Sequence, residues 1–365
     1  MIHVKDVLKV IEGFAPLSLQ ESYDNAGLIV GNENNPADSA LLTVDITEDV
    51  IEEAVRKKIN LIIAHHPIIF NGLKKITGRT YVERCVIKAI KNNISIIAVH
   101  TNIDSVISGV NKKICDKIGL TDIKILDEKN NFLAKLVTFI PSDYVDKVRE
   151  AIFNAGAGYI GNYDNCGFNV EGIGSFRAGD NSNPFVGKIG ETHYENEVRF
   201  ETVFPAYLKN KIIGAMLQSH PYEEVAYDIY PLLNDYSSAG SGMVGKLKEP
   251  AQEEEFLKRI KKIFKAKCIK HTKLSGKTIE KVAVCGGSGS FLLNNAIACG
   301  ANIFISADFR YHQFFDADDK IIIADIGHFE SEQYTTEIFY DVLTKNLTNF
   351  AAHFSEINTN PINYL

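Results

Sequence analysis

The order of hydrophobic and polar positions divides the chain into three parts. In residues 1–129, short apolar runs alternate with segments whose apolar residues recur at helical spacing. Short apolar runs bounded by turn residues predict buried strands, and the 3.6-residue spacing predicts helices. We expect strands at 41–45, 60–64 and 95–100, and helices from residue 48 and over 81–91. This alternation is typical of an α/β fold.

Residues 236–365 repeat the same rhythm. The expected strands are 281–285, 302–306 and 320–324, and the expected helices are 291–298 and a long one from about residue 329. The strand, helix and strand within 41–64 resemble those within 282–306, which indicates either an internal duplication or the general likeness of such α/β units. In each half, polar residues follow the second strand. Ligands of open α/β sheets gather at such strand ends.

The middle of the chain, residues 130–235, has a different order. Strands and helices alternate at 136–139, 144–154, 198–203, 206–218 and 225–230, with a further strand after the first helix. The order βαββαβ is that of a ferredoxin-like module. Its connection 174–190 is rich in glycine and is expected to be mobile or ordered by a ligand. We therefore predict an α/β core in two βα halves, 1–129 and 236–365, interrupted by an α+β insert at 130–235.

Composition narrows the class of protein. The chain has 365 residues and a formal net charge of -7, which gives no general attraction to nucleic acid or to an anionic membrane. Its six cysteines form no C-x-x-C pair, which fits a reducing compartment. The start of the chain has the spacing of an amphipathic helix and not of a signal peptide, and no apolar run reaches the ~20 residues that span a bilayer. We expect a cytoplasmic protein without a membrane or nucleic-acid partner.

Two adjacent imidazoles, His65 and His66, follow an apolar run and precede Pro67. Neighbouring side chains of a strand point to opposite faces, so both rings can reach one site only where the strand ends. Pro67 marks such an end, because it cannot donate a hydrogen bond to a sheet ladder. The pair predicts metal ligands.

Two further segments add imidazole and carboxylate groups just beyond apolar strands. One is 100–104 and the other is 325–332. His328 and Glu332 are four residues apart and share one helix face, whereas Glu330 points away. Taken singly, Asp104 also fits a turn or cap, and the His328 and Glu332 pair also fits an exposed ion pair. Three such segments meeting at one sheet edge predict a site for divalent metal.

The predicted ligands combine three ring nitrogens with two carboxylates. They are His65, His66, Asp104, His328 and Glu332. This set is too large for one open tetrahedral zinc and suits two ions roughly 3.5–4 Å apart. We expect two divalent ions per subunit, and without a thiolate ligand zinc, iron and manganese all remain open. Paired ions of this kind support hydrolytic chemistry.

Other polar residues could orient the ligands or relay protons. The catalytic candidates are Glu21, Asp24, His100 and His312, and the further supporting candidates are Asn25, Asp45, Asp308 and Tyr311. Each also fits a turn or cap. The run 286–290 could cradle a phosphate or form a plain tight turn, since it lacks the Lys-Ser/Thr ending of a P-loop. The run 219–224 could face a ligand or an oligomer interface, or form a structural turn.

These motifs resemble those of the Nif-three-like family, whose bacterial members are named GTP cyclohydrolase 1 type 2 homologs. The matching segments are 21–28, 65–67, 100–104, 308–312 and 327–332, in the family's order and spacing. The resemblance implies the same five metal ligands, a homohexameric toroid with dimetal sites facing an internal cavity, and an insert similar to PII and CutA modules. Tyr23 and Arg310 depart from the family, where Trp and Lys are common, which puts substrate contacts in doubt and not the metals.

Three functions compete at this point. The first is a metal-dependent hydrolase of a nucleotide-like, small phosphorylated or heterocyclic substrate, although the usual zinc cyclohydrolase site includes cysteine ligands and none is apparent here. The second is a metal-binding regulatory protein whose insert senses a metabolite. The third, a scaffold that bridges protein partners, rests only on the family's name.

Overall fold

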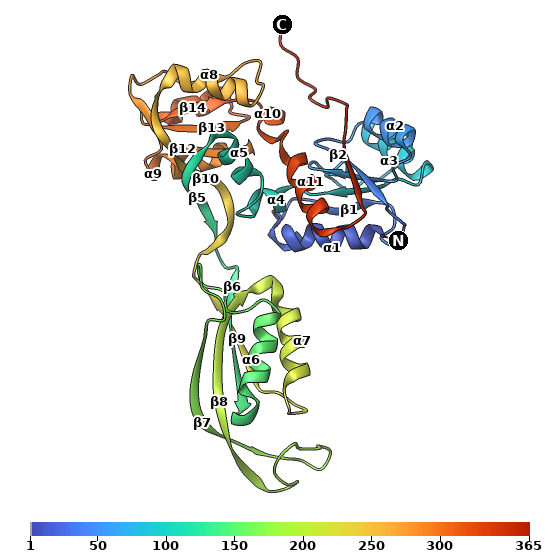
Figure 1. Cartoon of the computed structure of the whole chain (residues 1–365), viewed down its shortest axis with the longest axis vertical. Coiled ribbons are helices and arrows are strands. Elements are labelled where there is room, and N and C mark those ends of the chain that lie inside the picture. The colour runs from blue at the N-terminus through green and yellow to red at the C-terminus, as the bar shows by residue number, and fades with distance from the viewer. Residues whose placement is uncertain (1) are drawn as a thin grey trace. The chain divides into compact units, whose positions relative to one another are not determined.

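The computed structural model describes residues 2–365, and the chain forms two compact units (Figure 1). The first unit runs up to Asp127 and resumes at Ser238, and the second is Glu128–Ser237. The predicted insert, 130–235, lies within the second unit. The α/β class predicted from the hydrophobic pattern is confirmed.

The first unit contains two sheets, and the first of these has five strands in the order β1-β4-β3-β2-β15. The strands are β1 (Gly27–Val30), β2 (Ser39–Thr43), β3 (Leu61–Ala64), β4 (Ser95–Ala98) and β15 (Ala351–Phe354). Strands β15, β2, β3 and β4 are parallel, and β1 is antiparallel to β4. Both faces of the central strands are buried, as continuous apolar runs such as Leu61–Ala64 require.

Among the described residues, the first part of the chain contributes five α-helices. They are α1 (Val4–Phe14), α2 (Glu48–Lys57), α3 (Tyr81–Lys91), α4 (Thr101–Ser105) and α5 (Val110–Ile118). The Thr47 side chain accepts a hydrogen bond from the backbone of Val50 and so begins α2, and Thr80 caps α3 in the same way. Apolar residues of α2 and α3 pack on Leu41, Ile62 and Ile96 of the sheet in one core.

The second sheet of this unit has six strands in the order β11-β14-β13-β12-β10-β5. The strands are β5 (Leu120–Lys129), β10 (Tyr236–Gln252), β11 (Lys270–His271), β12 (Thr278–Ser288), β13 (Ile303–Ala307) and β14 (Ile322–Asp325). Strands β12, β13 and β14 are parallel, and β11 is antiparallel to β14. The helices of this half are α8 (Glu253–Ile263), α9 (Leu293–Ala298), α10 (His328–Glu332) and α11 (Thr335–Asn346), with the short 3-10 helix η5 (Tyr311–Ala317).

The second unit has the βαββαβ order predicted for it. Its elements are β6 (Leu133–Pro141), α6 (Val145–Asn154), β7 (Gly167–Arg177), β8 (Thr192–Pro205), α7 (Lys209–Ser219) and β9 (Tyr227–Leu232). The four strands form one antiparallel sheet, β7-β8-β6-β9, and one face packs on both helices around Leu136, Phe200 and Met216. The ring of His220 binds the carbonyl oxygen of Phe139 and accepts from the backbone of Tyr222, which gives the run 219–224 a structural role.

The structure differs from the sequence predictions at several places, and three of them are the most informative. The long helix expected from about residue 329 is broken into α10 and α11 by Gln333 and Tyr334. The run 286–290 is not a free loop, because β12 continues to Ser288. The long strands β5 and β10 were missed, because polar and apolar residues do not alternate cleanly along them.

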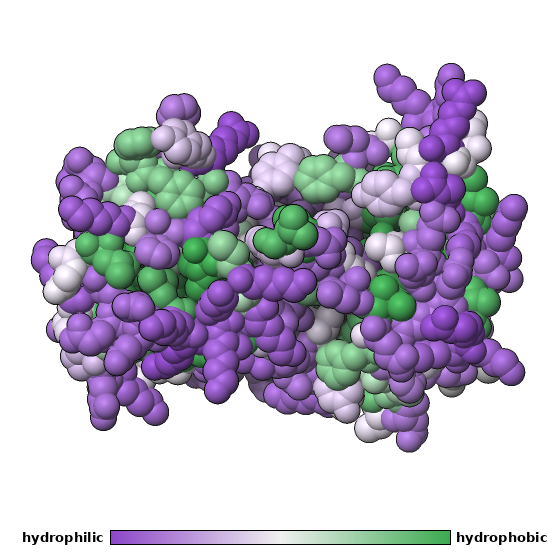
Figure 2. Space-filling view, turned by 90° about the horizontal axis from the view of Figure 1, so that it is seen from above, coloured by the Kyte–Doolittle hydropathy of each residue, from purple (hydrophilic) through white to green (hydrophobic). Residues whose placement is uncertain are grey.

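The last features of the fold are the hydropathy of its surface and the apolar character of its helices. The face seen in Figure 2 is mostly hydrophilic, with hydrophobic residues in separate small patches. Among residues 2–365, none of the helices combines the length and the apolar character that crossing a bilayer requires.

Candidate metal centre

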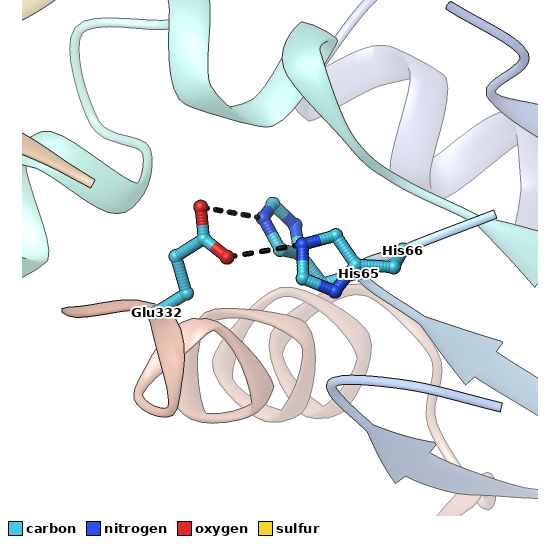
Figure 3. A group of neighbouring side chains, drawn as sticks. All are labelled: His65, His66 and Glu332. Atoms are coloured by element: carbon cyan, nitrogen blue, oxygen red, sulfur yellow. Dashed lines mark ion pairs between the residues drawn. The ribbon is translucent and has the colours of Figure 1, made fainter. Parts of the chain in front are cut away.

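The end of β3 and the helix α10 bring three possible ligands together, although they are far apart in the sequence. Ligand atoms of His65, His66 and Glu332 all lie within 4.8 Å of one another. Figure 3 shows the carboxylate of Glu332 facing both imidazoles, with one oxygen directed at each ring. Its oxygens lie 3.5 Å from His65 Nε2 and 3.0 Å from His66 Nε2. This group is a possible metal site.

His65 is held in one orientation by the backbone. Its side chain is fully buried, and its Nδ1 lies 2.9 Å from the carbonyl oxygen of Val99. Because a carbonyl only accepts, Nδ1 carries the proton and donates it. In the neutral ring, the lone pair of Nε2 is then left facing Glu332, which is the tautomer that metal-binding histidines adopt.

His66 and His328 are held by carboxylates in the same manner. His66 Nδ1 lies 2.7 Å from Asp45 Oδ1, and His328 Nδ1 lies 2.6 Å from Asp308 Oδ2. Their Nε2 atoms face each other at 3.2 Å. Two protonated nitrogens or two lone pairs at this distance repel each other. The contact is stable if one ring is protonated and donates to the other, or if both nitrogens lie about 2.0–2.1 Å from one shared cation.

The remaining predicted ligand, Asp104, lies on α4 at the edge of this group. Its Oδ1 is 3.8 Å from His65 Nε2. Among the described residues, His65 Nε2 and Asp104 Oδ1 are buried polar atoms without a hydrogen-bond partner. Such atoms cost free energy unless something else satisfies them. A divalent cation fits these orphaned atoms and the nitrogen and oxygen donor set.

The charges of the group perturb its pKa values strongly. Burial alone would lower the pKa of His66, but Asp45 and Glu332 raise it to about 9, and Glu332 with Asp308 raises that of His328 to about 11 despite burial. Burial raises the pKa of Asp104 to about 7, although the histidines oppose the shift. Burial also opposes ionisation of Glu332, yet the histidines keep its pKa well below the usual range. The carboxylates thus make this interior favourable for positive charge.

The catalytic candidates lie in different places. His100 lies beside the centre, with its ring centroid 5.4 Å from those of His65 and His66, and its Nδ1 is 2.7 Å from Asp24 Oδ1. The backbone N–H of Glu21 donates to the Thr101 hydroxyl. His312 lies on η5, where its ring contacts those of Tyr311 and Phe315, and in the described chain it makes no hydrogen bond, ion pair or ring contact with the group.

Sequence reasoning missed several residues that complete the centre. The hydroxyl of Thr359 donates to Asp45 Oδ2 at 2.6 Å, so the C-terminal segment supports the carboxylate that orients His66. Ser288 donates to Asp308 in the other half. Gly287 has φ of 63°, and a Cβ there would lie 2.3 Å from Glu332 Oε1. The run 286–290 therefore makes room for Glu332. The glycines at this strand end were the sequence signal that could have indicated such a close approach.

Comparison with known proteins decides the family. The family model of Duf34/NIF3 (NGG1p interacting factor 3) matches residues 2–361. The chain belongs to the Duf34/NIF3 family. This confirms the resemblance drawn from the motifs.

Members of the Duf34/NIF3 family are similar along the whole chain. A protein of Halalkalibacterium halodurans named GTP cyclohydrolase 1 type 2 homolog is 42% identical over 324 residues, which cover 88% of this chain and 87% of that protein. A Bacillus subtilis protein of the same name is 36% identical and covers 100% of this chain and 99% of its own. The crystal structure of a Bacillus cereus protein related to NIF3 matches with a TM-score of 0.88 at 34% identity, covering 100% of this chain and 99% of that one.

Proposed function

We propose that the chain binds two divalent metal ions per subunit and acts as a metal-dependent hydrolase. The proposed ligands are His65, His66, Asp104, His328 and Glu332, as the motif spacing predicted. The observation that carries the proposal is the gathering of imidazole and carboxylate donors around buried atoms that have no partner in the described chain. The names of the relatives support a nucleotide-like or otherwise phosphorylated or heterocyclic substrate.

The chain's own groups suit the steps of such a reaction. When bound, divalent ions lower the pKa of a water and stabilise negative charge on a substrate oxygen. Asp45, Asp308 and the Val99 carbonyl fix the three ligand imidazoles in one tautomer. His100 is part-buried at the rim and held by Asp24, so it is the candidate that moves a proton between the centre and solvent. Glu21 and His312 remain further candidates.

The test combines metal content with turnover. Purified protein is analysed for bound metals, loaded with zinc, iron or manganese, and assayed against GTP, a phosphodiester and an amide. We expect turnover of at least one substrate, and we expect Glu332→Ala to lose both metal and turnover. Glu254→Ala is the matched control, because Glu254 is an exposed glutamate of α8 that pairs with Lys258. Turnover that survives Glu332→Ala would contradict the proposal.

A regulatory role is the second candidate, because the second unit has its own core and no part in the metal group. In that case the protein would hold metal without turnover and bind a metabolite through residues 130–235. Replacing 130–235 with a short flexible linker would then abolish metabolite binding and leave metal content unchanged. Unchanged metabolite affinity would contradict this role. We expect the protein to form a homo-oligomer, a hexamer, in the cytoplasm under either role.

A further inference from the structure

An unusually basic stretch lies far from the metal ligands in the sequence. Residues 258–281 contain ten lysine and arginine residues and the single acidic residue Glu280. The formal charge of this stretch is therefore +9. Because the whole chain has a net charge of -7, all other residues together carry -16. The net charge used to disfavour anionic partners therefore hides a strongly cationic segment, and local fields of this kind attract anions.

This stretch forms one wall of a cleft of about 950 Å³ in the first unit. Lys270, Lys273 and Lys277 line the basic wall, and Tyr311, Phe314 and Phe315 of η5 line the aromatic wall. The volume is in the range of small-molecule sites, roughly 300–1,000 Å³. None of the proposed metal ligands lines this cleft.

The basic wall is held in place by its backbone. The carboxylate of Glu253, which is only 6% exposed, accepts from the backbone N–H groups of Ser275 and Gly276 at 3.0 Å each. At the other end, Thr272 exchanges two hydrogen bonds with the backbone of Ile323 on β14. A loop fixed at both ends loses little conformational freedom when a ligand binds.

The charges at the cleft differ in whether they already have partners. Lys270 pairs with Asp325 at 2.6 Å, and Lys320 pairs with Asp318 at 2.7 Å. Lys273 and Lys277 are exposed, and their ammonium groups form no ion pair with any described residue. These two cations are available for an anionic ligand.

The η5 residues that line the same cleft offer ring surfaces. Tyr311 is 74% exposed and Phe315 is 67% exposed, and their ring centroids lie 5.6 Å apart at 72°. Phe314, by contrast, packs on the core of the second sheet and anchors the wall. Exposed aromatic rings on an anchored element are a stacking surface for a flat heterocycle.

We propose that this cleft is a second ligand site, distinct from the metal centre, that binds a phosphorylated molecule carrying an aromatic ring, such as a nucleoside triphosphate. The phosphates lie at Lys273 and Lys277, and the ring stacks on Tyr311 and Phe315. The combination of two unpaired cations with exposed rings across one cleft selects this class over inorganic phosphate and over an uncharged heterocycle.

The test is calorimetric titration of the full-length, metal-loaded protein with ATP. We expect the double variant Lys273→Glu/Lys277→Glu to weaken binding at least tenfold. Tyr311→Ala/Phe315→Ala should weaken it roughly tenfold, in line with the loss of a stacked base. The matched control Lys262→Glu/Lys267→Glu makes the same charge change on the same stretch outside the cleft and should leave the affinity within about twofold.

Three further titrations separate the sources of binding. Tripolyphosphate and adenosine should each bind at least tenfold more weakly than ATP, because each supplies only half of the contacts. Glu332→Ala should bind ATP with unchanged affinity, which distinguishes this cleft from the proposed metal centre. The inference is overturned if the lysine and aromatic variants bind ATP normally, if the control variant loses as much affinity, if tripolyphosphate binds as tightly as ATP, or if Glu332→Ala loses the site.

Discussion

The two halves of the first unit share an arrangement of four strands but use it differently. In one half, β2, β3 and β4 are parallel and β1 is antiparallel to the last; in the other, β12, β13 and β14 are parallel and β11 is antiparallel to the last. The second strand of the first half ends in His65 and His66, whereas the second strand of the other half is followed by Asp308. Asp308 lies 2.6 Å from His328 Nδ1 and orients that proposed ligand.

After the third parallel strand, the second half supplies more of the proposed ligands than the first half does. The segment after β4 supplies Asp104 at the edge of the group, and the segment after β14 supplies His328 and Glu332 at its middle. Both halves therefore place polar residues at the carboxyl edge of their parallel strands, but the residues at equivalent positions have different roles. Whether a position holds a ligand or orients one depends on the side chain placed there.

The largest expected effect follows removal of the carboxylate shared by both halves. Glu332→Ala removes the group that lies 3.0 Å from His66 and 3.1 Å from His328 and leaves buried imidazoles facing each other. We expect metal binding to fall by more than roughly 100-fold, since a direct ligand matters more than an orienting one. Metal competition with a chromogenic chelator measures this. Retained affinity would show that the two halves do not share a site.

The next effect compares the orienting carboxylates of the halves. Asp45→Asn and Asp308→Asn each replace an ionised acceptor beside a ligand imidazole. We expect each to weaken metal affinity by roughly 10- to 100-fold. Asparagine also tolerates the left-handed backbone of Asp308, whose φ is 59°. A loss confined to one variant would show that the halves do not use equivalent supports.

A smaller effect concerns Asp24, a support found in the first half. Burial opposes its ionisation, but hydrogen bonds from His100 and Thr101 lower its pKa from 3.8 to about 2. Because the folded pKa lies below the unfolded one, this carboxylate stabilises the fold above about pH 4 and loses that contribution as the pH falls towards 2. Asp24→Asn should cost about 2 kcal/mol at pH 6 and less at pH 3, measured by urea unfolding. A difference that does not change with pH would contradict the assignment.

The smallest effect tests the C-terminal support of the first half. Thr359→Val keeps the shape of the side chain and removes the hydrogen bond to Asp45. We expect metal affinity to fall about fivefold, corresponding to roughly 1 kcal/mol for one hydrogen bond. Thr344→Val removes an exposed hydroxyl bond on α11 and should leave the affinity unchanged. Equal effects in the two variants would assign the loss to general destabilisation.

Local sequence signals were sufficient for much of the fold. The helical spacing from residue 48 and over 81–91 and the apolar runs at β2, β3 and β4 placed helices and strands close to their observed bounds, because propensity and burial agree there. The gathering of His65, His66 and Glu332 could be predicted because the two histidines follow an apolar strand and Glu332 lies on α10, just beyond another.

Other features depend on contacts between distant residues and leave no local signal. Thr359 supports Asp45 across 314 positions, and neither residue's neighbours in the sequence indicate the other. The break after Glu332 has no proline or glycine, because Gln333 and Tyr334 instead bind carbonyl oxygens at the end of α8. The cleft lined by Tyr311 and Phe315 was not predicted, because only the three-dimensional structure places these rings in the same cleft as the lysines.

The bond between Thr359 and Asp45 has a consequence for biosynthesis. A ribosome that has made the first half has already produced His65, His66 and Asp104, but the chain must be translated through residue 359 before the support of His66 is complete. The proposed metal centre would therefore have its full set of supporting contacts only after the segment that contains Thr359 has been made and has folded onto Asp45.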